Sequence, residues 1–135
     1  MTNKLRFRII NGGAWKPLDH RGVLDLMRRR NIPAVAGIYD DIEIADMSDD
    51  PATIAEKKKE LRRRVRDRLE DEIEERYSPI EVVALTAFQA EKPAWFSAMK
   101  SFIGSNFLAA RTVINDINAA TTWAELEAIE AAITV

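Results

Sequence analysis

The stretch EKKKELRRRVRDRLEDEIEERY, residues 56–77, is almost entirely charged, and its pattern decides the architecture of the chain. Its few apolar residues recur at every fourth position: Leu61, Val65, Leu69, Ile73 and Tyr77. This spacing predicts a single helix with a narrow apolar stripe, which suits contact with one partner better than burial in a core. Because a spacing of four drifts around a straight helix, the stripe predicts a short bundle or coil and not a long heptad seam.

The charges of this helix are sorted by sign, with most basic residues in 57–68 and most acidic residues in 70–75. This order opposes the helix dipole at both ends, at about 0.3–1 kcal/mol for each charge near a terminus. The order therefore indicates a partner, because an antiparallel copy or a neighbouring acidic surface would set the basic half against the acidic half. A solvated helix that only links two parts of the chain is the alternative. The predicted assembly seam consists of four apolar residues: Leu61, Val65, Leu69 and Ile73.

The basic half also raises the question of nucleic acid, since lysine and arginine neutralise phosphates. Two features argue against it: the acidic half would repel phosphate, and no aromatic residue lies among the basic ones to stack on bases. The whole chain has a net charge of −2, so no global field draws it toward nucleic acid or a membrane surface. Nucleic-acid binding through residues 57–68 stays open as a hypothesis, ranked behind self-association and a solvated linker.

The N-terminal fifty residues predict a small β-containing module. Apolar residues alternate with basic ones in a first strand: Leu5, Phe7 and Ile9. This is the period of a strand with one buried face. Residues 11–13 predict a turn that ends the strand. Residues 35–46 predict short extended pieces that pair with the first strand in a small sheet.

A short helix is expected between these strands. Asp19 is the predicted N-cap. The apolar face of the helix is expected to carry Val23, Leu24 and Met27, and three arginines in its last turn suit the helix dipole. Pro33 ends the pattern.

Everything after Ser48 predicts helix. Pro51 fits a first helical position behind a capping aspartate, and Ser78–Glu81 forms a capping box that starts a second helix. Pro93 restarts the helix after a break, and residues 104–106 predict a kink or a short interruption. Thr122 and Glu125 have the capping-box spacing, which predicts a final helix.

Together these patterns predict an α+β fold that is predominantly α. The expected parts are a small N-terminal α/β module (1–50), a long charged helix (51–77) and a C-terminal helical module or bundle (78–135). The 135 residues, 47% of them hydrophobic, correspond to one ordinary domain with enough apolar side chains for a core. No segment approaches the ~20 apolar residues of a membrane span, and we expect a soluble protein without a signal peptide.

No set of residues predicts catalysis, a cofactor or a metal, and we expect a protein that is not an enzyme. The chain has no cysteine, which removes disulfides and thiolate chemistry. His20, the only histidine, starts a helix, where a surface or capping role is expected. The acidic residues of 40–50 match no calcium loop and predict an exposed loop and helix cap. Trp15, beside a turn, is the predicted exposed anchor for a protein contact.

Residues 75–111, ERYSPIEVVALTAFQAEKPAWFSAMKSFIGSNFLAAR, resemble a helical segment of tail and tail-fibre-associated proteins of bacteriophages and prophages. In that family an Arg-Tyr-Pro turn follows a charged helix, a Met-x-x-Phe-Ile set lies on a later helix, and an Arg-containing helix ends the chain. The matching residues are Arg76, Tyr77, Met99, Phe102, Ile103 and Arg111. Residues 120–129, ATTWAELEAI, are similar to the usual final helix.

The resemblance covers about half of the chain and departs from the family pattern at two places. Ser78 stands where the family turn has proline, although Pro79 follows directly, and residues 82–84 replace a common Gln-Leu-Asn. The matching residues serve packing and capping, so the resemblance implies no active site and no cofactor.

The resemblance implies a structural protein of a phage tail or baseplate, made in the host cytoplasm and localised in the virion tail. Such a protein would act as an adaptor, with other tail, baseplate or fibre proteins as partners and with self-association into a homo-oligomer. Two alternatives remain open: a non-structural tail-fibre assembly chaperone, and a small nucleic-acid-binding regulator.

Overall fold

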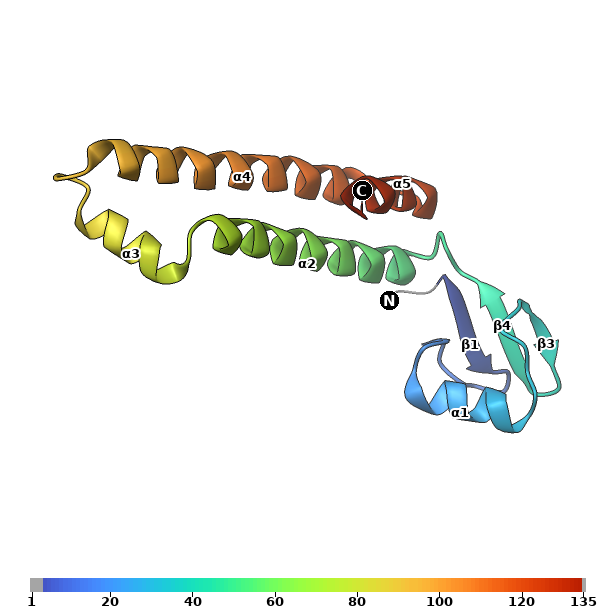
Figure 1. Cartoon of the computed structure of the whole chain (residues 1–135). Helices are drawn as coiled ribbons and strands as arrows, with labels where there is room; N and C mark the ends of the chain where they lie inside the picture. Colours follow the sequence, from blue (N-terminus) through green and yellow to red (C-terminus); the bar gives the residue numbers. More distant parts are fainter. Residues whose placement is uncertain (1–3, 135) are drawn as a thin grey trace. The chain divides into compact units, whose positions relative to one another are not determined.

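The computed structural model describes residues 4–134 and has the predicted α+β class, with helix predominant (Figure 1). In chain order the elements are β1 (Leu5–Ile9), β2 (Lys16–Pro17), α1 (Arg21–Arg29), β3 (Gly37–Tyr39), β4 (Ile42–Asp46), α2 (Pro51–Arg76), α3 (Pro79–Ala87), α4 (Pro93–Ala119) and α5 (Trp123–Thr134). The predicted strand at the N-terminus, the extended pieces in 35–46 and the helical remainder are all present.

The chain divides into two compact units. Unit 1 comprises Met1–Glu60 and Thr121–Leu126, and unit 2 comprises Leu61–Ala120 and Glu127–Val135. This division differs from the predicted boundaries after residues 50 and 77. The charged helix α2 is not a separate connecting part, because its first ten residues belong to unit 1 and the rest to unit 2.

Unit 1 is built on an antiparallel four-stranded sheet with the strand order β2-β1-β4-β3. Phe7 of β1 lies opposite Ile44 of β4, and Ile9 lies opposite Ile42. This register places the apolar side chains of the two central strands on one face of the sheet. The sequence pattern does not predict β2, because two residues are too few to show a period.

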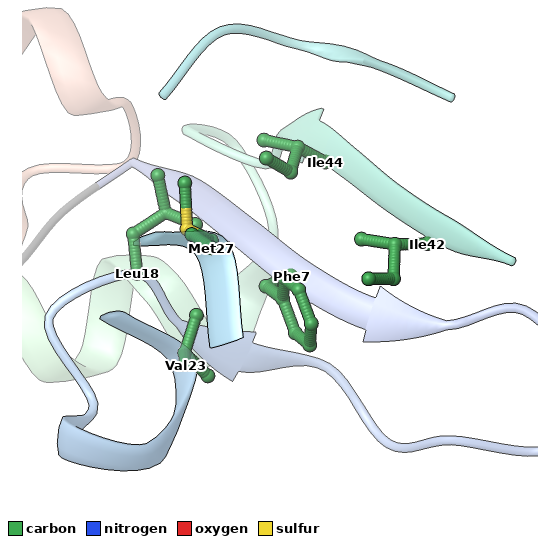
Figure 2. Packing of buried hydrophobic residues seen from close by; sticks show 6 residues of the cluster. All are labelled: Phe7, Leu18, Val23, Met27, Ile42 and Ile44. Carbon is green, nitrogen blue, oxygen red and sulfur yellow. The ribbon is translucent and has the colours of Figure 1, made fainter. Parts of the chain in front are cut away.

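Helix α1 covers this face and completes the core of unit 1. Six buried side chains form that core: Phe7, Leu18, Val23, Met27, Ile42 and Ile44. Figure 2 shows them gathered around α1, β1 and β4. The N-cap of α1 is His20 and not the predicted Asp19. Leu24, expected on the buried face, is exposed, because at about 100° per residue it lies beside the arc that Val23 and Met27 share.

Unit 2 is a helical hairpin in which α4 runs antiparallel to α2 (Figure 1). Two contacts fix the pairing of the helices. The Arg62 guanidinium donates to the Asn118 side-chain carbonyl at 2.9 Å. At the other end, the rings of Tyr77 and Phe102 meet edge to face, with their centroids 5.7 Å apart. Met99 and Ile117 of α4 are buried, and α3 packs against α4.

The predicted starts of α2 and α3 are confirmed. Pro51 is the first residue of α2, and the Asp50 carboxylate accepts a hydrogen bond from the Ala52 N–H at 3.1 Å. The capping box of α3 is present, with the Ser78 hydroxyl accepting from the Glu81 N–H at 3.2 Å. These capping residues can be recognised in the sequence, because their side chains accept hydrogen bonds from backbone N–H groups that the first helical turn leaves unpaired.

The interruption predicted at residues 104–106 is absent, because α4 is continuous from Pro93 to Ala119. A single glycine in a helix costs only about 1 kcal/mol relative to alanine, which the packing of a long helix outweighs. The Asn106 amide also donates to the Phe102 carbonyl at 2.9 Å, within the helix. Between residues 4 and 134, none of the helices combines the length and the apolar character needed to cross a membrane.

Candidate interaction surfaces

The predicted assembly seam on α2 is, for its first half, an intrachain contact. Leu61 is fully buried and Val65 is 6% exposed, so the chain itself covers both side chains. Leu69 and Ile73 are partly buried. The four-residue stripe is therefore not a free surface for a second copy at Leu61 and Val65. The pattern identifies the buried side of α2 but carries no information on whether the covering residues come from the same chain.

Arginines that flank this buried side have partners within unit 2. Arg62 bonds Asn118, and the Arg64 guanidinium lies 3.2 Å from the Glu130 carboxylate. Arg68 lies 3.0 Å from Glu72 and also donates to the Ile133 carbonyl. These contacts hold α2 to α4 and to the end of α5. They also direct much of the basic half toward the protein rather than toward a phosphate backbone.

Among the described residues of unit 1, two cations are buried, which the sequence pattern does not predict. Arg6 is 5% exposed and pairs with the Glu56 carboxylate at 2.7 Å. Lys57 is 4% exposed, and its ammonium lies 5.1 Å from the centroid of the Trp123 ring. The alternation in β1 places Arg6 opposite the core face, but it does not show that the start of α2 covers that second face. Lys57, the first residue of the basic run, is thus unavailable to an external phosphate.

Large apolar side chains are exposed along α3, at its C-cap and at the start of α4. We call this set the tip surface, and its members are Ile80 (82% exposed), Val83 (70%), Phe88 (57%) and Trp95 (60%). From the ~150–250 Å² that a large aromatic side chain presents, the exposed areas of the four side chains add up to on the order of 500 Å². The Lys92 ammonium lies 4.9 Å from the centroid of the Trp95 ring. The tip surface thus combines a capped helix, α3, with several large exposed apolar side chains.

A half-open cavity of about 300 Å³ lies on unit 2, lined by α2, α4 and α5. Most of its walls are aliphatic, and three of the contributing residues are alanines: Ala109, Ala110 and Ala132. Arg68, Glu72, Asn106 and Asp116 supply polar groups to the lining. The small side chains of α4 and α5 leave this space open, since larger residues at the same positions would fill it.

We expect Ala110→Leu to raise the free energy of unfolding by about 1 kcal/mol, because the added carbons fill part of this cavity. Ala98→Leu makes the same change at an exposed position of α4 and is the matched control, with an expected effect within about 0.5 kcal/mol. Urea unfolding followed by circular dichroism measures both. Equal effects of the two substitutions would show that the cavity is not available to a larger side chain.

Trp15, the predicted anchor, is half-buried, and the Arg8 guanidinium lies 4.6 Å from the centroid of its ring. Arg8 in turn pairs with Glu43 at 2.7 Å. The indole is thus held on unit 1 by a cation–π contact instead of projecting freely. Its role as an anchor for another protein stays a prediction.

The acidic residues of 40–50 mostly serve the fold. Their partners are Arg30 for Asp41, Arg8 for Glu43, Ser48 for Asp46, the Trp123 N–H for Asp49 and the Ala52 N–H for Asp50. Hydrogen bonds from the Ser48 backbone and hydroxyl lower the pKa of Asp46 below its ordinary value, with a further contribution from Lys4. Within residues 4–134, no three potential ligands gather into a group that could hold a metal ion.

No family model, no curated protein and no solved structure matches the chain.

Proposed function

We propose that this chain is a structural adaptor of a phage tail or baseplate, which acts through protein–protein contacts and self-association. It would reside in the virion tail after synthesis in the host cytoplasm. Its partners would be other tail, baseplate or fibre proteins. The observation that carries the proposal is the tip surface, because large exposed apolar side chains on a capped helix are typical of a contact site.

The residues of the family resemblance support this proposal by where they lie. Tyr77 and Phe102 are in contact, Met99 is buried, and the Arg76 guanidinium lies 5.8 Å from the centroid of the Tyr77 ring. These residues join α2 to α4 at the end of the hairpin that carries α3. The residues quoted for the resemblance therefore lie among the contacts at the junction of α2, α3 and α4.

We expect Val83→Asp to reduce incorporation of the chain into phage particles at least tenfold, because it places a charge in the apolar contact. Gln89→Asp adds a charge at an exposed polar position of the same tip and should leave incorporation unchanged. Quantitative mass spectrometry of purified virions, referred to a capsid protein, measures both. Equal incorporation of the two variants would contradict the role of the tip surface.

The same experiment separates the assembly-chaperone alternative. A chaperone would bind a fibre in the lysate through the tip surface and be absent from finished particles, whereas an adaptor is retained in them. We do not propose nucleic-acid binding, because Lys57 is buried and Arg62, Arg64 and Arg68 have partners within the chain.

A further inference from the structure

The side of α2 opposite its buried stripe carries charges of both signs. Arg63, Arg66, Asp67 and Glu70 are all exposed, and their spacings of three and four place them on one face of the helix. Among the described residues, no ion pair or side-chain hydrogen bond engages any of the four, although Arg62, Arg64 and Arg68 on the flanks of the same helix are engaged. We call these four residues the outer face of α2.

The outer face is complementary to itself when one helix is reversed. Arg63 and Glu70 lie equally far from the point between Arg66 and Asp67, and they have opposite signs. Arg66 and Asp67 are the central pair of the same arrangement. The pattern continues one turn further in both directions, to Lys59 and Glu74. An antiparallel copy with its two-fold axis at the centre therefore meets an opposite charge at every position, as a symmetric interface requires.

We propose that a second copy of this chain docks antiparallel on the outer face of α2, with the two-fold axis between Arg66 and Asp67. This deepens, and rests on, the self-association in the proposed function. Each Arg63 then pairs with Glu70 of the other copy, and each Arg66 pairs with Asp67. A parallel copy in register would set Arg63 against Arg63 and Glu70 against Glu70, so the charges select the antiparallel orientation.

The charges set the orientation of the dimer and, as a network of several pairs, contribute to its affinity, although each exposed ion pair is weak by itself. The dimer is therefore sensitive to salt. It is strongest near 10 mM salt, where the screening length is about 30 Å, and weakens near 1 M, where that length is about 3 Å. Such a contact joins copies when their local concentration is high, as in an assembling tail.

Complementary charge reversals test the pairing. Arg63→Glu alone and Glu70→Arg alone each turn two attractive pairs of the dimer into repulsive ones, and each should weaken dimerisation about tenfold or more. An equimolar mixture of the two variants should form a heterodimer of wild-type strength, because the glutamate introduced at position 63 then faces the arginine introduced at position 70. Sedimentation equilibrium at low salt measures the association, and circular dichroism verifies that each variant is folded.

Arg111→Glu is the matched control, since it makes the same charge change on an exposed position of α4. It should leave dimerisation unchanged. Association of the single variants at wild-type strength, or a mixture that stays as weak as its components, would overturn the proposal. A wild-type chain that is monomeric at low salt would also overturn it.

Disulfide cross-linking tests the orientation of the two copies. The chain contains no cysteine, so every disulfide that forms involves an introduced cysteine. In the antiparallel dimer, the cysteine of Asp67→Cys should form a disulfide with the same position of the second copy. Glu74→Cys does not, since the two thiols lie about 22 Å apart along the axis at 1.5 Å per residue. Lys59→Cys mixed with Glu74→Cys should cross-link. Efficient self-cross-linking at both 67 and 74 would indicate a parallel pair and contradict the proposal.

These tests are independent of the adaptor function. Failure of the charge reversals removes the outer face as a self-contact and leaves incorporation through the tip surface untouched. Failure of Val83→Asp to change incorporation, with the charge reversals behaving as expected, removes the tip contact and leaves the dimer.

Discussion

Replacement of Leu61 by alanine is expected to lower the free energy of unfolding of unit 2 by about 3 kcal/mol. Leu61 is fully buried, and the loss of its side chain both removes apolar burial and leaves a cavity, which together cost about 2–5 kcal/mol for a buried leucine. The existing cavity beside Val65 and Leu69 lies one turn away, so the void would enlarge an already loosely packed region. Urea unfolding followed by circular dichroism measures the change.

Leu108→Ala is the matched control, because Leu108 is also helical but 65% exposed. We expect a change within about 0.5 kcal/mol for this variant. The comparison separates two interpretations of the stripe on α2. If Leu61 served a seam between copies and not the chain's own core, Leu61→Ala would change the solution mass while the monomer kept its stability. Similar losses from the two leucine variants would therefore count against the intrachain packing.

The second large effect is expected in unit 1. Ile42→Ala should lower the free energy of unfolding of that unit by about 2–4 kcal/mol, because Ile42 is fully buried and belongs to the core cluster around α1. Its neighbour across the β3–β4 pair, Tyr39, is partly buried and packs on the same cluster. Hydrogen exchange of the β1 and β4 amides reports the loss in this unit separately from unit 2.

Ile38→Ala provides the control for the sheet. Ile38 lies on the adjacent strand β3 and is 69% exposed, so the same chemical change removes little buried area. We expect an effect within about 0.5 kcal/mol. A loss of protection for Ile38→Ala as large as that for Ile42→Ala would mean that the face assigned to the core is wrong.

Local signals predicted the elements well because each depends on a few neighbouring residues. The period of two in β1 and the capping residues before α2 and α3 correspond to hydrogen bonds and burial within one element. Leu24 and the expected kink near Gly104 show the limit of such signals. Tertiary packing decides whether a side chain at the edge of a helical arc is buried, and whether a long helix continues through a single glycine.

The candidate surfaces were less predictable, because burial on a charged helix depends on which segment covers it. The spacing of Leu61 and Val65 indicates one apolar side of α2, but α4 and α5, far away in the sequence, decide whether that side is free. Lys57 illustrates the same point for charge, since Trp123 lies against it. The sequence does not indicate the tip surface, because Ile80 and Val83 have the pattern of core residues in an ordinary amphipathic helix, whereas the structure leaves both exposed.

The charge order of α2 was recognised in the sequence as a sign of a partner, but its geometry required the structure. Contacts within unit 2 engage Arg64 and Arg68. The outer face, which carries Arg63 and Arg66 together with two acidic residues, stays exposed. The engaged and the exposed arginines are only one or two residues apart along α2, so a count of basic and acidic residues does not show which of them are free to meet a second copy. The self-complementary set is the one that remains for a second copy.

The most direct test of self-association through α2 is the solution mass of the purified wild-type chain, determined by light scattering after size exclusion at low and at high salt. We expect a dimer at low salt that dissociates as salt rises, because exposed charge pairs hold the two copies in register. A chain that stays monomeric at both salt concentrations, even when the protein itself is concentrated, would contradict the pairing of the outer faces.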